Sequence, residues 1–251
     1  YSRFELFHLD PPAALTQDLG AWSHRQRASW IDAFAAHLRQ GTTELTPDLP
    51  WHKLSQVGHP GLTDQLRNYL ASPDEGLLVQ HLMLHLARHN DGAGLGALTR
   101  AWACDRSRHG HTRALALMAT LAGTDRELDW LADLLDDPTD VDDELRGIVL
   151  RTWLERAWCS VDTLLPYVRR PPEAFYGAYY AFLMHYLVRD RTQAEVLSLL
   201  LFAAGADGPL SWDTNGPGTG LDFTREVVTA SRPHLGLDEF RAALVDVLRR
   251  A

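Results

Sequence analysis

Two stretches that lie 33 residues apart, VQHLMLHLARHND (residues 79–91) and TRALALMATLAGT (residues 112–124), carry leucines at equivalent positions before a turn. Sliding the chain on itself by this interval places Leu82 on Leu115. Apolar residues that recur every three or four positions are typical of an amphipathic helix. The interval therefore indicates a repeated unit that contains a helix and a turn.

The same interval places Arg113 on Arg146, and Arg146 on Tyr179. A rhythm of helix, short turn and second helix persists, although the units agree weakly residue by residue. The units end near Ala103, Leu135, Val168 and Ala203. A pair of helices cannot bury its apolar face alone, so neighbouring pairs must stack. We predict an all-α fold, an α-solenoid of irregular HEAT-like helical hairpin repeats.

Apolar spacing and glycine or proline breaks predict the helix positions. A helix is expected over 23–39 with a stop at Gly41, and another after Ser72 or Asp74. Trp153 is expected to be buried between two helical pairs. Residues 3–7 could also form a strand. The other expected helices cover residues 95–103, 112–121, 126–135, 143–158, 161–168, 174–188, 194–204 and 237–248.

These patterns divide the chain into three parts. Residues 1–72 are expected to form an N-terminal helical segment that links to an upstream domain, and residues 73–205 the helical repeat core. Residues 206–251 are expected to form a long loop and C-terminal helices. Because the first residue is Tyr1 and not methionine, we expect the chain to be a piece of a longer protein.

The composition argues against several classes of protein. The 251 residues hold 24 Lys+Arg against 33 Asp+Glu, a formal net charge of −9, which disfavours binding to a phosphate backbone. No apolar run approaches the ~18–20 residues that cross a bilayer. Cys104 and Cys159 lie in apolar helical patterns, which predicts two buried free thiols in a reducing compartment. We expect a cytoplasmic protein without membrane or nucleic-acid partners.

Neither of two glycine-rich stretches, 92–96 and 216–220, follows an expected strand or precedes a Lys-Ser/Thr pair. Lys53, the only lysine, lies elsewhere. A P-loop needs that ammonium group beside the phosphate. We therefore expect no nucleotide or other cofactor. The acidic stretch 125–144 lacks the glycine of a calcium loop and is expected to be a solvated ridge.

Histidines supply the alternative of a metal-dependent enzyme. His81, His85 and His89 lie at positions i, i+4 and i+8 and share one helix face, a spacing that can hold a transition metal. Metal sites usually draw ligands from several elements. We therefore favour a semi-exposed helix edge without a metal. No Gly-x-Ser-x-Gly elbow or Cys-His arrangement indicates a nucleophile, so no catalytic residue is expected and the chain is not expected to be an enzyme.

A polar loop at 211–220 is longer than repeat turns require, and such loops often bind a partner. Trp212 is a side chain of the type enriched at binding hot spots. A plain insertion, with Trp212 as a structural plug, is the alternative. The expected partner-binding residues are Trp212, Asp213, Asn215, Arg169, Arg170 and Tyr176.

The chain shows a family resemblance in five stretches. They are residues 113–123, 128–135 and 143–146, Arg170-Pro171-Pro172, and residues 175–183. They resemble the helical repeats that follow the NACHT module in actinobacterial STAND NTPases. The resemblance covers residues 75–205. It implies a sensor or autoinhibitory arm of a cytoplasmic signalling or antiphage-defence NTPase. The partner would be its own upstream NTPase domain, which would carry the ATP-binding lysine, or another protein. A free-standing HEAT-like scaffold or adaptor is the alternative.

The histidine stripe gives the first testable prediction. We expect the purified protein to contain no structural zinc, because the stripe offers ligands from one helix only. Elemental analysis should find well below one zinc per chain, and a chelator should leave the thermal unfolding temperature unchanged. Unfolding by the chelator would support the metalloenzyme alternative instead.

Overall fold

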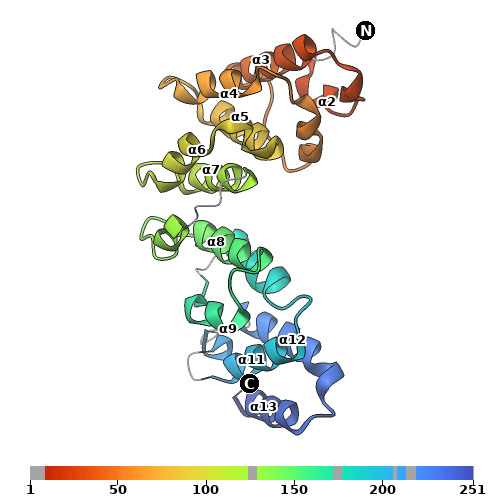
Figure 1. Cartoon of the computed structure of the whole chain (residues 1–251), viewed down its shortest axis with the longest axis vertical. Helices are drawn as coiled ribbons and strands as arrows, with labels where there is room; N and C mark the ends of the chain where they lie inside the picture. Colours follow the sequence, from red (N-terminus) through yellow and green to blue (C-terminus); the bar gives the residue numbers. More distant parts are fainter. Residues whose placement is uncertain (1–8, 124–128, 172–176, 206–207, 213–218, 251) are drawn as a thin grey trace. The chain divides into compact units, whose positions relative to one another are not determined.

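The computed structural model describes residues 9–123, 129–171, 177–205, 208–212 and 219–250. Helices are the regular secondary structure throughout these residues, which confirms the all-α prediction (Figure 1). The chain divides into two compact units, Tyr1–Leu128 (unit 1) and Asp129–Ala251 (unit 2). This division lies inside the range 73–205 that the sequence assigned to one repeat core. No helix among the described residues is both long and apolar enough to span a bilayer.

The first part of unit 1 is a group of helices with Trp30 and Phe34 fully buried in its core. The Trp30 ring meets Phe34 edge-on at 5.3 Å, and its Nε1 donates to the Pro11 carbonyl at 2.9 Å. Ser23 and Gln26 form a capping box, and Gly41 ends the same helix with a φ of 66°. These features confirm the helix expected over 23–39. The helices of this part are α2 (Pro11–Ala14), α3 (His24–Gln40), α4 (Leu62–Ala71) and α5 (Leu77–His89).

The second half of unit 1 is formed by α6 (Gly96–Cys104) and α7 (Gly110–Ala122), which pack against each other, while α7 also packs on α5 (Figure 1). Arg113 of α7 is fully buried, and its Nε donates to the Ala103 carbonyl at 2.9 Å. The helix expected after Ser72 or Asp74 is α5, but it begins a few residues later than predicted, at Leu77. The chain ends α4 at Ala71 and begins α5 after Gly76.

Unit 2 contains helices of four to thirteen residues joined by short helical turns. Here α8 packs on α10, and α11 packs on α9, α12 and α13; Figure 1 shows α11 beside α13. The helices are α8 (Glu144–Glu155), α9 (Val161–Leu164), α10 (Ala178–Ala181), α11 (Gln193–Ala204), α12 (Thr219–Ser231) and α13 (Asp238–Arg250). The 3-10 turns Asp129–Leu134, Leu165–Tyr167 and Pro209–Trp212 and the π-helix Phe182–Tyr186 connect them.

Four expected helices of unit 2 are shorter than predicted. The one expected over 143–158 is α8, which ends at Glu155. The part of 126–135 that the structure describes is a 3-10 helix, and the helix expected over 161–168 ends as α-helix at Leu164, because Pro166 continues it as a 3-10 turn. The helix expected over 174–188 is described from Ala178 and becomes a π-helix at Phe182. The strand considered at 3–7 lies outside the described residues.

Two expectations of burial were wrong. Trp153 is only half-buried, and its ring meets Tyr167 edge-on at 5.9 Å. Cys104 is exposed and Cys159 is partly exposed. Both cysteines lie where a helix has ended or is ending, so the neighbouring helical pairs do not cover them. The spacing of apolar residues did not predict that α6 ends at Cys104 and that α8 ends before Cys159.

Gly147 allows α8 and α10 to approach closely. A Cβ atom at this position would lie 2.2 Å from the Tyr179 backbone nitrogen, far closer than a Cβ approaches a non-bonded heavy atom. Tyr179 is fully buried at this crossing. Its hydroxyl donates to the Arg169 carbonyl and accepts from the Arg169 N–H, both at 2.8 Å. The missing side chain therefore sets the spacing of the two helices.

We predict that Gly147→Ala destabilises unit 2 by about 3 kcal/mol, the upper end of the range for overpacking, because the clashing atoms belong to backbone. Urea unfolding followed by circular dichroism measures the change. Gly236→Ala is the matched control in the same unit, because a Cβ there meets nothing within 4 Å. Equal stability of the two variants would contradict the close crossing.

Candidate functional site

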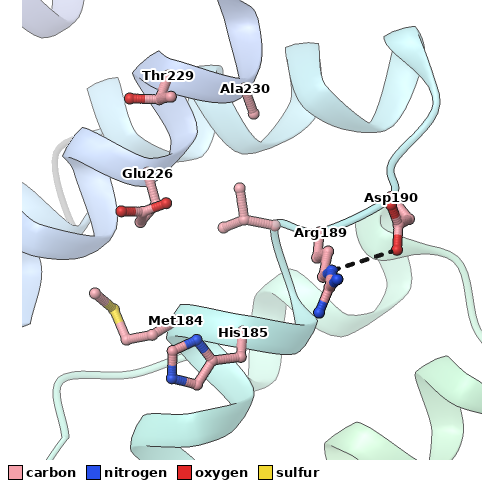
Figure 2. Close-up of a pocket in the computed structure, with 8 residues that line it drawn as sticks. Met184, His185, Arg189, Asp190, Glu226, Thr229 and Ala230 are labelled. Carbon is pink, nitrogen blue, oxygen red and sulfur yellow. Dashed lines mark ion pairs between the residues drawn. The ribbon is translucent and has the colours of Figure 1, made fainter.

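Unit 2 contains a pocket of about 470 Å³ between the π-helix and α12 (Figure 2). Figure 2 shows Glu226 and Thr229 on α12 facing the segment that carries Met184 and His185. The chain segment that follows the π-helix forms the remaining wall. The lining residues are Met184, His185, Val188, Arg189, Asp190, Glu226, Thr229 and Ala230.

Local backbone geometry forms the pocket wall. The Leu187 N–H donates to the Phe182 carbonyl at 2.8 Å, five residues back, as a π-helix requires. Asp190 then adopts a φ of 55°, a left-handed conformation that reverses the chain. Thr192 and Glu195 form a capping box that begins α11. Short π-helices occur frequently at functional sites, so the wall has a feature beyond ordinary helix packing.

The charged groups of the pocket are open to solvent. Arg189 and Asp190 form an ion pair with an Nε–Oδ2 distance of 3.6 Å, and their side chains are 78% and 90% exposed. An exposed pair contributes little to stability. His185 and Glu226 are exposed as well. The fold therefore does not need these charges, and they remain available to a ligand.

The pocket combines donors and acceptors with an apolar part. Asp190 and Glu226 supply carboxylates, Arg189 supplies a guanidinium group, and Met184 and Val188 supply apolar surface. Ligand pockets generally combine an apolar lining with a few polar groups that fix orientation. Both signs of charge suit a dipolar ligand, such as a segment of polypeptide with charged side chains.

A second cluster of charges lies beneath the N-terminus of α8. Asp143 contacts Arg146 at 3.2 Å and Arg169 at 2.6 Å, and the side chains of Asp143 and Arg146 are only 4% and 3% exposed. Arg146 also donates to the Tyr167 carbonyl and pairs with Asp136, both at 2.8 Å. The cluster therefore joins α8 to two loop segments of unit 2.

Glu144 extends this cluster to α10. Its carboxylate accepts the Ala178 N–H at 3.0 Å at the start of that helix. Burial raises the pKa of Glu144, although this hydrogen bond opposes the shift. Gly177 lies so close to the Glu144 carboxylate that a Cβ would be 2.4 Å from Oε1. The contact positions the chain that leads into the pocket wall.

Three of the residues expected to bind a partner, Arg169, Arg170 and Trp212, lie among the described residues. Arg169 pairs with Asp143 in the charged cluster, and both Arg169 and Arg170 are exposed. Trp212 is only 6% exposed, and its ring meets Phe202 edge-on at 6.5 Å. This burial contradicts Trp212 as an accessible partner contact and agrees with the plug alternative, because the 3-10 turn at 209–212 packs on α11 and α12. Asp213, Asn215 and Tyr176 lie outside the described residues.

The histidine stripe is less exposed than expected. His81 is buried, and its Nε2 lies 2.9 Å from the Thr112 hydroxyl. The half-buried His85 ring stacks on Trp51 at 4.1 Å. Helix α5 packs between α7 and the 3-10 helix Trp51–Val57, which covers this face. Within the residues that the structure describes, no group of histidine, cysteine or acidic side chains could hold a metal ion.

Comparison of the chain with protein-family models, curated proteins and solved structures finds no match. None of the pocket residues was predicted from the sequence to belong to a binding site. One signal was present, because Thr192-x-x-Glu195 is a capping-box pattern that places a helix start at 193 and a loop just before it. Glu226 and Thr229 carry no such signal, since only the packing of α12 brings them to residues about 40 positions earlier.

We predict that Asp143→Asn lowers the free energy of unfolding of unit 2 by about 3 kcal/mol, because Arg146 then loses its buried counter-charge. Asparagine tolerates the left-handed φ of 54° at this position, so the change tests charge rather than backbone strain. Urea unfolding measures the effect.

Asp222→Asn is the matched control for this prediction. It removes an exposed pair with Arg225 at 3.2 Å and should cost less than about 1 kcal/mol. A loss at Asp143 no larger than at Asp222 would show that the buried pair does not stabilise unit 2.

Proposed function

We propose that this chain is a non-catalytic helical-repeat interaction module, and that the pocket between the π-helix and α12 binds a segment of a protein partner. The exposed charges of the pocket carry the proposal. Arg189, Asp190 and Glu226 lie around a volume of about 470 Å³ without being used to hold the fold. Exposed charges of both signs around a pocket favour a partner with complementary charges.

Side chains at equivalent positions of successive 33-residue repeats are buried, and this supports the repeat architecture. The 33-residue interval aligns Arg113, Arg146 and Tyr179, and all three side chains are buried. Arg113 and Arg146 each donate to a backbone carbonyl, of Ala103 and Tyr167 respectively. Helices that repeat a buried polar position at a constant interval are consistent with HEAT-like hairpins, whose extended surfaces commonly bind proteins.

The partner that we propose is an NTPase domain of the same polypeptide, and the chain then acts as its sensor or autoinhibitory arm in a cytoplasmic signalling or antiphage-defence protein. The resemblance of residues 75–205 to the repeats that follow NACHT modules supports this assignment. A free-standing scaffold would use the same pocket on a separate protein.

Site-specific photo-crosslinking tests the pocket in the protein as its gene encodes it. A photoreactive amino acid at Thr229 in the pocket should give cross-links to one defined segment, located by mass spectrometry. The charge swap Arg189→Glu with Glu226→Arg should reduce this yield at least tenfold, since complementary charges would become repulsive. Both side chains are exposed, so folding should be unaffected.

Asp162 on α9 provides the control, because it is exposed in the same unit and lies outside the pocket. Cross-links at Thr229 within the same polypeptide support the arm, and cross-links to a separate protein support the scaffold. Equal yields from Thr229 and Asp162, or a yield that the charge swap leaves unchanged, would overturn the assignment of the pocket.

A further inference from the structure

Helix α5 carries one buried and two half-buried histidines in unit 1. His81, His85 and His89 follow one another along one face, which packs on α7 and on the 3-10 helix Trp51–Val57. Imidazole is the side chain whose ordinary titration falls between pH 5 and pH 8. Its protonation in a packed interface would change the charge of that interface within this range.

His81 occupies the contact with α7. It is buried, with its Nε2 2.9 Å from the Thr112 hydroxyl and its ring 5.1 Å from the His111 ring, edge-on. A protonated His81 would face a second imidazole that itself accepts protons. Arg113, the next residue of α7 after Thr112, is buried and donates to the Ala103 carbonyl. None of these α7 residues carries a carboxylate.

His85 occupies the contact with the 3-10 helix. Its ring stacks on Trp51 at 4.1 Å. Its Nδ1 is buried and has no hydrogen-bond partner among the described residues. Protonation would place an N–H donor there without an acceptor, and burial of an unsatisfied, charged donor costs free energy. The geometry at His85 therefore favours the neutral ring.

The charges around the stripe would add to this cost. Arg88 lies on the same helix, His52 faces His89 from the 3-10 helix, and His109 faces both His81 and His111 at the start of α7. Arg88 is a cation, and the other groups are imidazoles. Like charges disfavour further protonation.

Acidic groups on the elements that pack on α5 are engaged or exposed. Asp32 of α3 accepts hydrogen bonds from the side chains of Gln65 and Tyr69 of α4. The other carboxylates on or beside these elements are also paired or exposed. Asp64 pairs with Arg67, Glu75 with Arg39 and Asp105 with Arg108, and Asp74 and Asp91 are exposed. The described surroundings of the stripe therefore supply no carboxylate to balance a new positive charge.

Burial, helped by the neighbouring cations, lowers the pKa of His81 to about 4 and the pKa of His85 to about 3. An unfolded histidine titrates near ~6.5. Between that value and the folded pKa values the unfolded chain binds more protons than the folded chain. Stability is therefore full above about pH 6.5 and falls as the pH is lowered towards 4.

We propose that the histidines of α5 make unit 1 an acid-sensitive element, in which protonation of His81 and His85 opens the packing of α5 against α7 and the 3-10 helix Trp51–Val57. Unit 2 keeps its structure under the same conditions. The device is independent of the proposed binding function, because it lies in the other unit and uses none of the pocket residues.

Hydrogen exchange of the whole protein, read by mass spectrometry, tests the device at pH 7.5 and pH 5.5. After correction for the intrinsic exchange rate, the opening constant of the peptides that cover α5 and α7 should rise about 10-fold for each of the two histidines, or about 100-fold together. Peptides from α11 should change by less than about 3-fold, since carboxylates with pKa values near ~4 are not yet protonated.

The variant His81→Gln with His85→Phe should abolish the rise. Glutamine keeps a polar group near the Thr112 hydroxyl, and phenylalanine keeps the stack on Trp51. His24→Gln is the control, because this histidine is exposed at the start of α3. A full rise in the double variant, no rise in the natural chain, or an equal rise in α11 would overturn the proposal.

A measurement on the natural chain covers the case of a variant that does not fold. Nuclear magnetic resonance of the labelled imidazole carbons should show two histidines that remain neutral down to about pH 5, well below the ordinary value of ~6.5. Titration of every histidine near 6.5 would overturn the proposal without any variant.

Discussion

The close crossing of α8 and α10 is the constraint on which unit 2 depends. Gly147 has no side chain, so the backbone of Tyr179 lies where a Cβ would be. This approach buries Tyr179, whose hydroxyl satisfies both backbone polar groups of Arg169. The chain that leaves this crossing continues directly into the π-helix at Phe182 and so into the pocket wall. Gly147 on α8 thus helps to fix the position of α10 and of the π-helix that lines the pocket.

Buried charge then holds the same region together. Asp143 lies between Arg146 and Arg169, and Glu144 caps the start of α10 through the Ala178 N–H. Buried ion pairs stabilise weakly compared with apolar packing, but the loss of one partner is costly. The arrangement therefore favours one specific packing of these loops. The pocket charges Arg189 and Glu226 differ in kind, because they lie in solvent and the fold does not use them.

Unit 1 uses polar groups in another way. Arg113 is buried against a backbone carbonyl, and the His81 and His85 rings pack against α7 and Trp51. A neutral imidazole packs well in such an interface: the His85 ring stacks on Trp51, and the His81 ring lies within hydrogen-bonding distance of the Thr112 hydroxyl. The same choice makes the interface depend on the protonation of His81 and His85. Fold alone does not define activity. The binding proposal is therefore based on the exposed charges of the pocket in unit 2, and the acid-response proposal on His81 and His85 in unit 1.

Local patterns in the sequence determined the all-α class, α3 with its cap at Ser23, and α6, α7, α11 and α13 nearly to their ends, because side-chain periodicity and capping act within a few residues. The 33-residue interval aligned Arg113, Arg146 and Tyr179, and the structure buries all three side chains. Tertiary structure alone decided that Trp212 is buried on Phe202, that Cys104 is exposed, and that Glu226 lies across a pocket from His185. The physical reason is the separation along the sequence over which each interaction acts. Burial and charge contacts between residues far apart in sequence depend on how helices cross, and a crossing such as that at Gly147 is set by atoms that no local pattern brings together.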